Sequence, residues 1–180
     1  MAGAPVSVWR ETVRLGELAR GRVHRRLEPD SAQLAGLAGQ LGLGSLESLT
    51  AEVTVSSWLD GAEVDGRFTA QVTQICGVTL DPFEATVSGD FRVRVVPPGS
   101  PNIPANEEGD EMELDLDADD PPDVLEGEEI DIAHYVTEHL ALEIDPFPRK
   151  PDAVFEPPAP EEEASPFAVL RKLRQDDSPK

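Results

Sequence analysis

The chain has 180 residues, of which 36 are acidic and 15 are basic, so its formal net charge is −21, and 39% are hydrophobic. This length fits one domain with appendages, and the single cysteine, Cys76, excludes an internal disulfide framework and a zinc site built from cysteines. No apolar run is long enough to span a membrane and the first residues lack the apolar stretch of a secretory signal, so we expect a cytoplasmic protein.

The N-terminal region is weakly basic and is expected to contribute two strands. Residues 1–26 hold six arginines and two glutamates. Apolar and β-branched side chains predict one strand around residues 6–13 and another around residues 22–27.

A short amphipathic helix is predicted next. Leu34, Leu37 and Leu41 recur at helical spacing, and either Asp30 or Ser31 can cap the first turn. Interior glycines weaken this helix, each by roughly 1 kcal/mol relative to alanine, so the helix needs packing against the rest of the protein.

Three longer strands with one apolar face follow the helix. Residues 49–59, 64–75 and 84–96 alternate apolar and polar side chains. Between the first two, Asp60-Gly61 predicts a tight hairpin turn with positive φ angles. One buried and one solvated face is typical of an antiparallel sheet.

The most acidic segment separates these strands from a second helix. Residues 101–165 carry 22 acidic and two basic residues, and residues 97–129 are predicted to form an acidic, flexible loop because like charges repel and prolines interrupt the segment. Residues 115–126 match the donor positions of a calcium-binding loop but lack its central glycine, so we expect no metal site. Residues 131–142 predict a helix that Asp145-Pro146 ends.

These elements define an expected architecture of the α+β class. It combines an antiparallel β-sheet with a few short helices, a long acidic loop and a proline-rich C-terminal tail. Residues 1–150 are expected to form a single domain and residues 151–180 the tail. Within the tail, Ser165-Pro166 is a good start for a short amphipathic helix over residues 165–174.

Motifs that carry enzymatic chemistry are missing from the sequence. There is no phosphate-binding loop, no dinucleotide-binding glycine motif and no nucleophile elbow. Cys76 has no Cys-x-x-Cys partner, since Thr79 occupies that position, and a buried structural thiol is expected there. We therefore expect a protein that is not an enzyme and that needs no cofactor.

Three blocks of sequence carry a family resemblance. The first is TQICGVTLDPF at residues 73–83, and the second runs from residues 130–142 into DPFPRKP at residues 145–151. The third is SPFAVLRKL at residues 165–173. In this order the three blocks resemble the YceD family, the large ribosomal RNA subunit accumulation proteins. Many members carry Cys-x-x-Cys in the first block, where this chain keeps only the first cysteine.

The resemblance implies motif and partner-binding residues but no catalytic ones. The family-motif positions are Cys76, Thr79, Leu80, Pro82, Asp131, Glu138, Leu140, Pro146, Pro148 and Arg149. Residues expected to dock on a partner lie in the third block and are Pro166, Phe167, Leu170, Arg171, Lys172 and Leu173. RNA binding needs positive charge, and the candidate RNA contacts are Arg20, Arg22, Arg25 and Arg26.

The function implied by the resemblance is ribosome biogenesis. The protein is expected to support synthesis, processing or stability of the large-subunit (23S) rRNA by binding the large-subunit precursor, through the rRNA, a basic ribosomal protein or both. A second hypothesis is an acidic chaperone that holds a basic ribosomal protein before its incorporation, with the acidic segment imitating nucleic acid. Neither hypothesis calls for a membrane, DNA or a small-molecule substrate.

Overall fold

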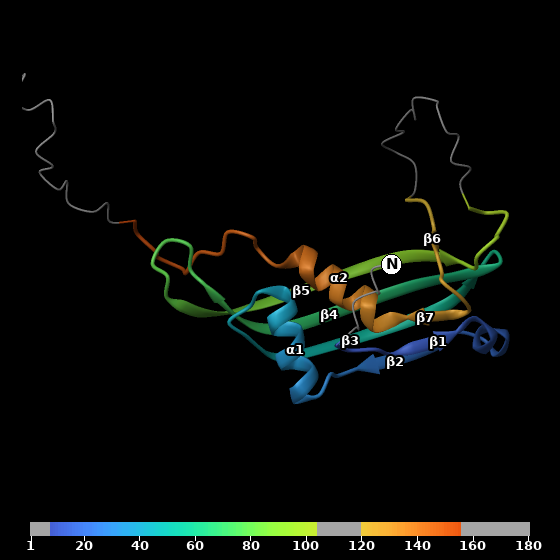
Figure 1. The fold of residues 1–180 in the computed structure, drawn as a ribbon, viewed down its shortest axis with the longest axis horizontal. Helices are drawn as coiled ribbons and strands as arrows, with labels where there is room; N and C mark the ends of the chain where they lie inside the picture. Colours follow the sequence, from blue (N-terminus) through green and yellow to red (C-terminus); the bar gives the residue numbers. More distant parts are fainter. Residues whose placement is uncertain (1–7, 104–119, 156–180) are drawn as a thin grey trace, which may run out of the picture.

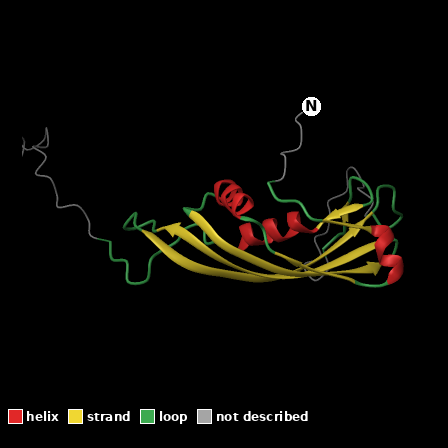
Figure 2. Cartoon of the chain, turned by 90° about the horizontal axis from the view of Figure 1, so that it is seen from below, coloured by secondary structure: helices red, strands yellow, loops and turns green. Residues whose placement is uncertain are grey.

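A computed structural model describes residues 8–103 and 120–155 of the chain. Its main sheet has five strands in the order β2-β3-β4-β5-β6. The three central strands are long and pair antiparallel along their length; β3 spans Ser45–Trp58, β4 spans Gly61–Ile75 and β5 spans Pro82–Val96. Figure 2 shows that this sheet is curved. The predicted α+β fold with an antiparallel sheet is confirmed.

Shorter elements complete the edges of the structure. On one side, β2 (Val23–Leu27) pairs antiparallel with β3, and on the other, β6 (Asp123–Val124) pairs parallel with the end of β5. A second, two-stranded sheet joins β1 (Thr12–Arg14) to β7 (Glu129–Asp131). A 3-10 helix, η1 (Leu15–Arg20), connects β1 to β2.

Two α-helices cover the same face of the main sheet (Figures 1 and 2). The first, α1 (Ser31–Leu41), begins at Asp30, whose carboxylate accepts hydrogen bonds from the backbone N–H groups of Ala32 and Gln33. The second, α2 (Ile132–Glu143), packs on β4 and β5. Both helices were predicted from the sequence at these positions. Within the described ranges, no helix has the length and apolar composition needed to cross a membrane.

The core lies between the helices and the alternating apolar side of the sheet. Val55 of β3, Val64 of β4 and Val95 of β5 are fully buried, as are Val136 and Leu140 of α2. The opposite face of the sheet carries cross-strand ion pairs, which join Arg92 to Asp65, Arg94 to Glu63 and Arg67 to Glu52. The predicted alternation in the three long strands is therefore confirmed.

Phenylalanines and glycines face each other across β4 and β5. Gly66 lies opposite Phe91, and Phe68 lies opposite Gly89. A Cβ atom at Gly66 would lie 2.2 Å from Cζ of Phe91, so the ring occupies the space that a side chain would fill. The Phe91 ring also stacks on His139 of α2, with 4.3 Å between ring centroids. These contacts fix the register of β4 and β5 beneath α2.

The β3–β4 turn differs by one residue from the predicted Asp60-Gly61 turn. Trp58 pairs with Gly61, so Leu59 and Asp60 form the turn, and the positive φ angle, 50°, belongs to Leu59. Gly61 is required for another reason. A Cβ atom there would lie 1.9 Å from the carbonyl oxygen of Val95, so the glycine permits close approach of two backbones.

The acidic segment also differs from the loop predicted over residues 97–129. Its first part packs on the β3–β4 turn, where Ser100 and Asn102 donate hydrogen bonds to the Asp60 carboxylate at 3.0 and 2.7 Å. Its last part returns to the protein and forms β6 and the start of β7. Residues 104–119 lie outside the described residues. The burial of Leu125 and Ile130 is the physical reason for this return, because both belong to the core.

The N-terminal strand is the remaining difference. It was predicted around residues 6–13, and among residues 8–14, where the described chain begins, only Thr12–Arg14 form a strand. Trp9, which precedes the strand, is buried without being part of a sheet. An apolar side chain can be buried there without strand pairing, and the sequence pattern does not distinguish a buried strand from a buried irregular segment.

Replacing Gly61 by alanine should destabilise the fold. The added methyl group clashes with the backbone of β5, which cannot move aside without breaking the sheet, so we expect a loss of about 1–3 kcal/mol in the free energy of unfolding. Gly39→Ala is the matched control, because a Cβ atom at Gly39 meets nothing within 4 Å and the residue lies in α1. Chemical denaturation should show a gain of about 0.5–1 kcal/mol for the control. Equal stability of the two variants would contradict this account of Gly61.

Candidate functional site

The β4–β5 turn and the segment after α2 form one end of the molecule, which we call the tip (residues 74–82 and 145–151). The turn is closed by two backbone hydrogen bonds of 2.9 Å, one from the Cys76 N–H to the Asp81 carbonyl and one from the Leu80 N–H to the Cys76 carbonyl. This closed turn contains most of the first sequence block. It places Leu80 at the surface with a φ angle of 61°.

The second sequence block packs directly on the first at the tip. The Gly77 N–H donates to the Pro148 carbonyl at 2.9 Å, and the side chain of Gln74 donates to the Asp145 carbonyl at 3.3 Å. The Lys150 N–H lies 3.4 Å from the Cys76 sulfur. Two segments more than seventy residues apart in sequence are thus held together by one hydrogen bond between main-chain groups and by two that join the Gln74 and Cys76 side chains to the main chain of the other segment.

The Cys76 thiol is buried at the centre of this contact. Backbone N–H groups of Val78, Thr79 and Lys150 point at its sulfur at 3.4–3.5 Å. The hydrogen bond from the Thr79 side chain, followed by those from the Lys150 and Thr79 backbones, lowers the pKa of Cys76 to about 6, although burial acts in the opposite direction. The sulfur is thus an internal acceptor that joins the two segments.

The family-motif positions separate into two groups in the structure. Seven lie in the tip, and these are Cys76, Thr79, Leu80, Pro82, Pro146, Pro148 and Arg149. Leu80 is 75% exposed, whereas Leu140 is fully buried in the core. Glu138 pairs with His134 on the exposed side of α2, at 3.5 Å. The structure thus brings together the motif residues of the first and second blocks, except those on or beside α2.

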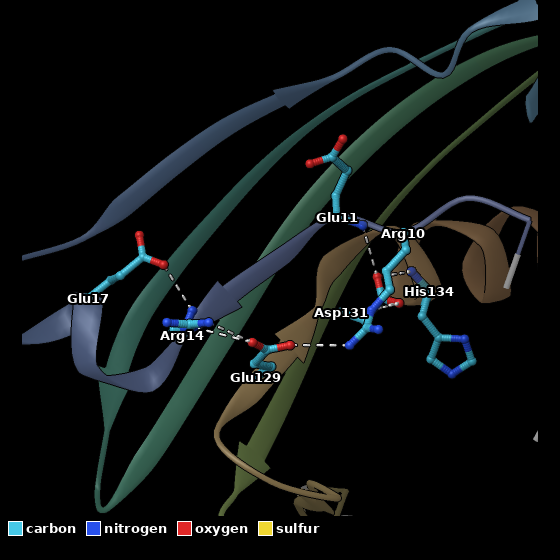
Figure 3. A network of polar contacts seen from close by, with 7 residues as sticks. All are labelled: Arg10, Glu11, Arg14, Glu17, Glu129, Asp131 and His134. Atoms are coloured by element: carbon cyan, nitrogen blue, oxygen red, sulfur yellow. Dashed lines mark hydrogen bonds and ion pairs between the residues drawn. The ribbon is translucent and has the colours of Figure 1, made fainter. Parts of the chain in front are cut away.

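Asp131, the remaining motif residue, anchors the N-terminal strand to α2 (Figure 3). Its Oδ1 accepts hydrogen bonds from the backbone N–H groups of Glu11 and His134, both at 3.3 Å. The second of these caps the first turn of α2. Arg10 completes the arrangement, since its guanidinium lies 3.9 Å from the other oxygen of Asp131 and 3.2 Å from Glu129.

Most N-terminal arginines already have acidic partners within the described residues. Arg14 pairs with Glu129 at 3.2 Å, beside Arg10 (Figure 3). Arg25 pairs with Glu17 at 3.3 Å and Arg26 with Glu28 at 2.7 Å. Of the four candidate RNA contacts, Arg20 and Arg22 are exposed without an ion pair to any described residue. The structure therefore separates the four into two paired and two accessible cations.

The partner-docking residues of the third block lie outside the described residues, together with the predicted helix over residues 165–174. The described ranges contain no group of three or more His, Cys, Asp or Glu side chains placed to hold a metal ion. Asp123, one of the residues compared with a calcium loop, instead accepts a hydrogen bond of 3.2 Å from the hydroxyl of Tyr135. Burial, together with this carboxylate, raises the pKa of Tyr135, so the phenol stays protonated.

A cavity beside β5 was not anticipated from the sequence. It has a volume of about 500 Å³, and its walls come from the end of β5, from the chain that enters β6 and from His139 of α2. No sequence signal marks this site, because its walls meet only when residues 120–124 return to the sheet.

Removing the Asp131 carboxylate should weaken both the N-terminal cap of α2 and the hydrogen bond to the Glu11 backbone, which precedes β1. We expect Asp131→Ala to lower the free energy of unfolding by about 1–2 kcal/mol, as measured by chemical denaturation. Glu138→Ala is the control, because this exposed carboxylate of α2 makes only a surface pair, worth about 0–1 kcal/mol. A loss for Asp131→Ala no larger than that of the control would contradict the anchoring role.

The Cys76 thiolate should make stability depend on pH. Because the pKa falls from 9.0 to about 6 on folding, its stabilising effect is complete above about pH 9 and is lost as the pH falls through 6. The melting temperature of the wild type relative to Cys76→Ser should therefore rise between pH 6 and pH 9. Thr79→Val removes the hydroxyl donor, and ultraviolet absorbance of the thiolate should show a higher pKa in this variant. If the difference in melting temperature between the wild type and Cys76→Ser does not change from pH 6 to pH 9, Cys76 remains a neutral thiol in this range.

Comparison with known proteins identifies the family. The family model described as "Large ribosomal RNA subunit accumulation protein YceD" matches residues 64–174, more than half of the chain. The match begins in β4 and includes both segments of the tip. No curated protein and no solved structure gives a significant match. The chain belongs to the YceD family of large ribosomal RNA subunit accumulation proteins.

Proposed function

We propose that this protein is a non-enzymatic ribosome-biogenesis factor that binds the large-subunit precursor in the cytoplasm and supports synthesis, processing or stability of its 23S rRNA. The observation that carries the proposal is the family match over residues 64–174. The tip supports it, because the first family block and the end of the second, residues 145–151, are hydrogen-bonded to each other there. Leu80 and Phe147 are 75% and 78% exposed at the tip, although apolar side chains gain nothing from exposure to water.

The charge of the chain favours contact with a precursor particle over contact with bare RNA. A net charge of −21 opposes approach to a phosphate backbone. Arg20, Arg22 and Arg149 are exposed and have no ion pair within the described residues, so they are the described arginines most accessible to rRNA. We propose that they contact rRNA only after the acidic parts of the chain have met basic ribosomal proteins.

The third family block is proposed as a docking element. Its apolar residues Phe167, Leu170 and Leu173 share one side of the helix expected from the sequence, and basic residues accompany them. An isolated helix of this length is marginally stable in water, so it needs a binding surface to form.

A second candidate function is an acidic chaperone for a basic ribosomal protein. It is favoured by the concentration of charge, since residues 101–165 carry 22 acidic and two basic residues. Such a segment attracts basic protein extensions and repels nucleic acid. The two candidate functions differ in what the protein binds. A biogenesis factor stays bound to the large-subunit precursor, whereas a chaperone releases the basic ribosomal protein before that protein is incorporated.

Co-sedimentation with large-subunit precursors tests the proposal. We expect Arg20→Gln/Arg22→Gln to reduce co-sedimentation, because it removes accessible cations. Arg25→Gln/Arg26→Gln is the matched control, since it removes the same charge from arginines already paired with Glu17 and Glu28. Bare rRNA fragments should bind weakly at about 0.15 M salt, where the screening length is about 8 Å.

Nuclease treatment before recovery separates the two candidates. Loss of the bound material after treatment supports binding to the rRNA of the precursor, whereas a retained basic protein supports the chaperone. Absence of precursor components from the recovered material, both with and without nuclease, would refute the proposed function.

A further inference from the structure

The outer edge of β5 is open along most of its length. On the side away from β4, only Val95 and Val96 pair with another strand, β6, and residues 82–93 have no second strand partner among the residues that the structure describes. In Figure 1, β6 lies beside one end of β5 only. The pairing of β5 with β4 has no register shift, so this edge is continuous and regular.

The direction of the outward-facing backbone groups follows from the β6 contact. The Leu125 N–H donates to the Val96 carbonyl at 2.9 Å, so this carbonyl points to the outer edge. Backbone groups of alternate residues in a strand point to the same side. The outward N–H and C=O groups therefore belong to the even-numbered residues, and none has a hydrogen-bond partner in the described chain from Glu84 to Arg92.

An edge of this kind is a template for another extended chain. Unpaired N–H and C=O groups bind an added strand by the same ladder that joins neighbouring strands of a sheet. The edge ends at the cavity of about 500 Å³, whose lining includes Val93, Asp123 and His139. This cavity offers space for a side chain of the added strand.

The charge along the edge determines which chain it fits. The carboxylates of Glu84 and Asp90 are exposed and have no ion pair within the described residues. Glu143 of α2 adds a third carboxylate, with its Cγ atom 3.0 Å from the Cβ position of Gly89. The arginines of the same strand are already paired, Arg92 with Asp65 and Arg94 with Glu63.

We propose that the outer edge of β5, residues 82–93, binds an extended basic peptide as an added antiparallel or parallel strand. Backbone hydrogen bonds supply the affinity, and the carboxylates of Glu84, Asp90 and Glu143 select lysine and arginine side chains. RNA is disfavoured by these carboxylates, and a second copy of the chain is disfavoured by its net charge of −21. This inference rests on the proposed function, because it names how the protein holds a basic protein component of the precursor.

The test uses the full chain and a synthetic peptide of about ten alternating lysine and valine residues, long enough to pair along this edge. We expect saturable binding at about 0.15 M salt.

Amide hydrogen exchange measured by NMR locates the bound peptide. The outward N–H groups of Thr86, Ser88 and Asp90 should become protected from exchange when the peptide binds. The same peptide with alternate amides N-methylated keeps its charge but loses donors, and it should bind about tenfold more weakly.

Charge variants provide the second arm. Glu84→Gln/Asp90→Asn should weaken peptide binding severalfold. Glu11→Gln/Glu47→Gln is the matched control, because both carboxylates are exposed and the same charge is removed. Glu11 precedes β1 and Glu47 lies on β3, neither of which pairs with β5, so the affinity of this control should match the wild type.

Several outcomes would overturn the inference. Equal binding of the N-methylated peptide, or no protection along β5, would show that diffuse charge attracts the peptide. Protection by single-stranded RNA instead of the peptide, or concentration-dependent protection with dimer formation in sedimentation, would assign the edge to RNA or to a second copy. If the wild-type protein co-sediments with the precursor but does not bind the peptide, the inference is wrong and the proposed function stands.

Discussion

The register between β4 and β5 is the constraint on which the other parts of the structure depend. Gly66 opposite Phe91 and Phe68 opposite Gly89 allow two aromatic rings to lie flat on the sheet beneath α2. A shift by one residue would turn the apolar side chains of β5 to the solvent and place charged ones under the helix. The same register pairs Ile75 with Pro82 and thereby sets the closed turn of the tip.

The tip is a turn whose shape is set by hydrogen bonds within it and to the segment after α2. Main-chain hydrogen bonds close it, and the Cys76 sulfur accepts N–H groups from its own turn and from Lys150. The motif residues therefore divide into a buried part that holds the two segments together and an exposed part, with Leu80 and Arg149, that is available to a partner. A second cysteine is not needed for this arrangement, since Thr79 supplies a hydroxyl donor instead.

The same fold determines which charged side chains are paired with one another and which remain accessible. Acidic residues of β7 pair with Arg10 and Arg14, and acidic residues of β3 and β4 pair with arginines on the face of the sheet opposite the helices. Pairs of this kind at the surface contribute little to stability, about 0–1 kcal/mol each. Their effect is on recognition, because they reduce the accessible positive charge and leave carboxylates along the edge of β5.

The sequence alone determined the elements whose signals are local. Alternation predicted the three long strands, leucine spacing and Asp30 predicted α1, and the residues before Asp145-Pro146 predicted α2. Motif residues of the tip were identified by family resemblance, which does not depend on knowing their contacts. Periodicity and capping involve residues within a few positions of one another, so they can be detected without tertiary structure.

Only the tertiary structure decided how distant segments meet. Gly61 is required by the backbone of Val95, Cys76 contacts Lys150 from 74 positions away, and Arg10 contacts Glu129 from 119 positions away. The return of residues 120–131 to the sheet was hidden by their acidic composition, because burial of Leu125 and Ile130 outweighs the repulsion between their neighbours. Such contacts depend on which surfaces the folded core brings together, and no local pattern of residues encodes that geometry.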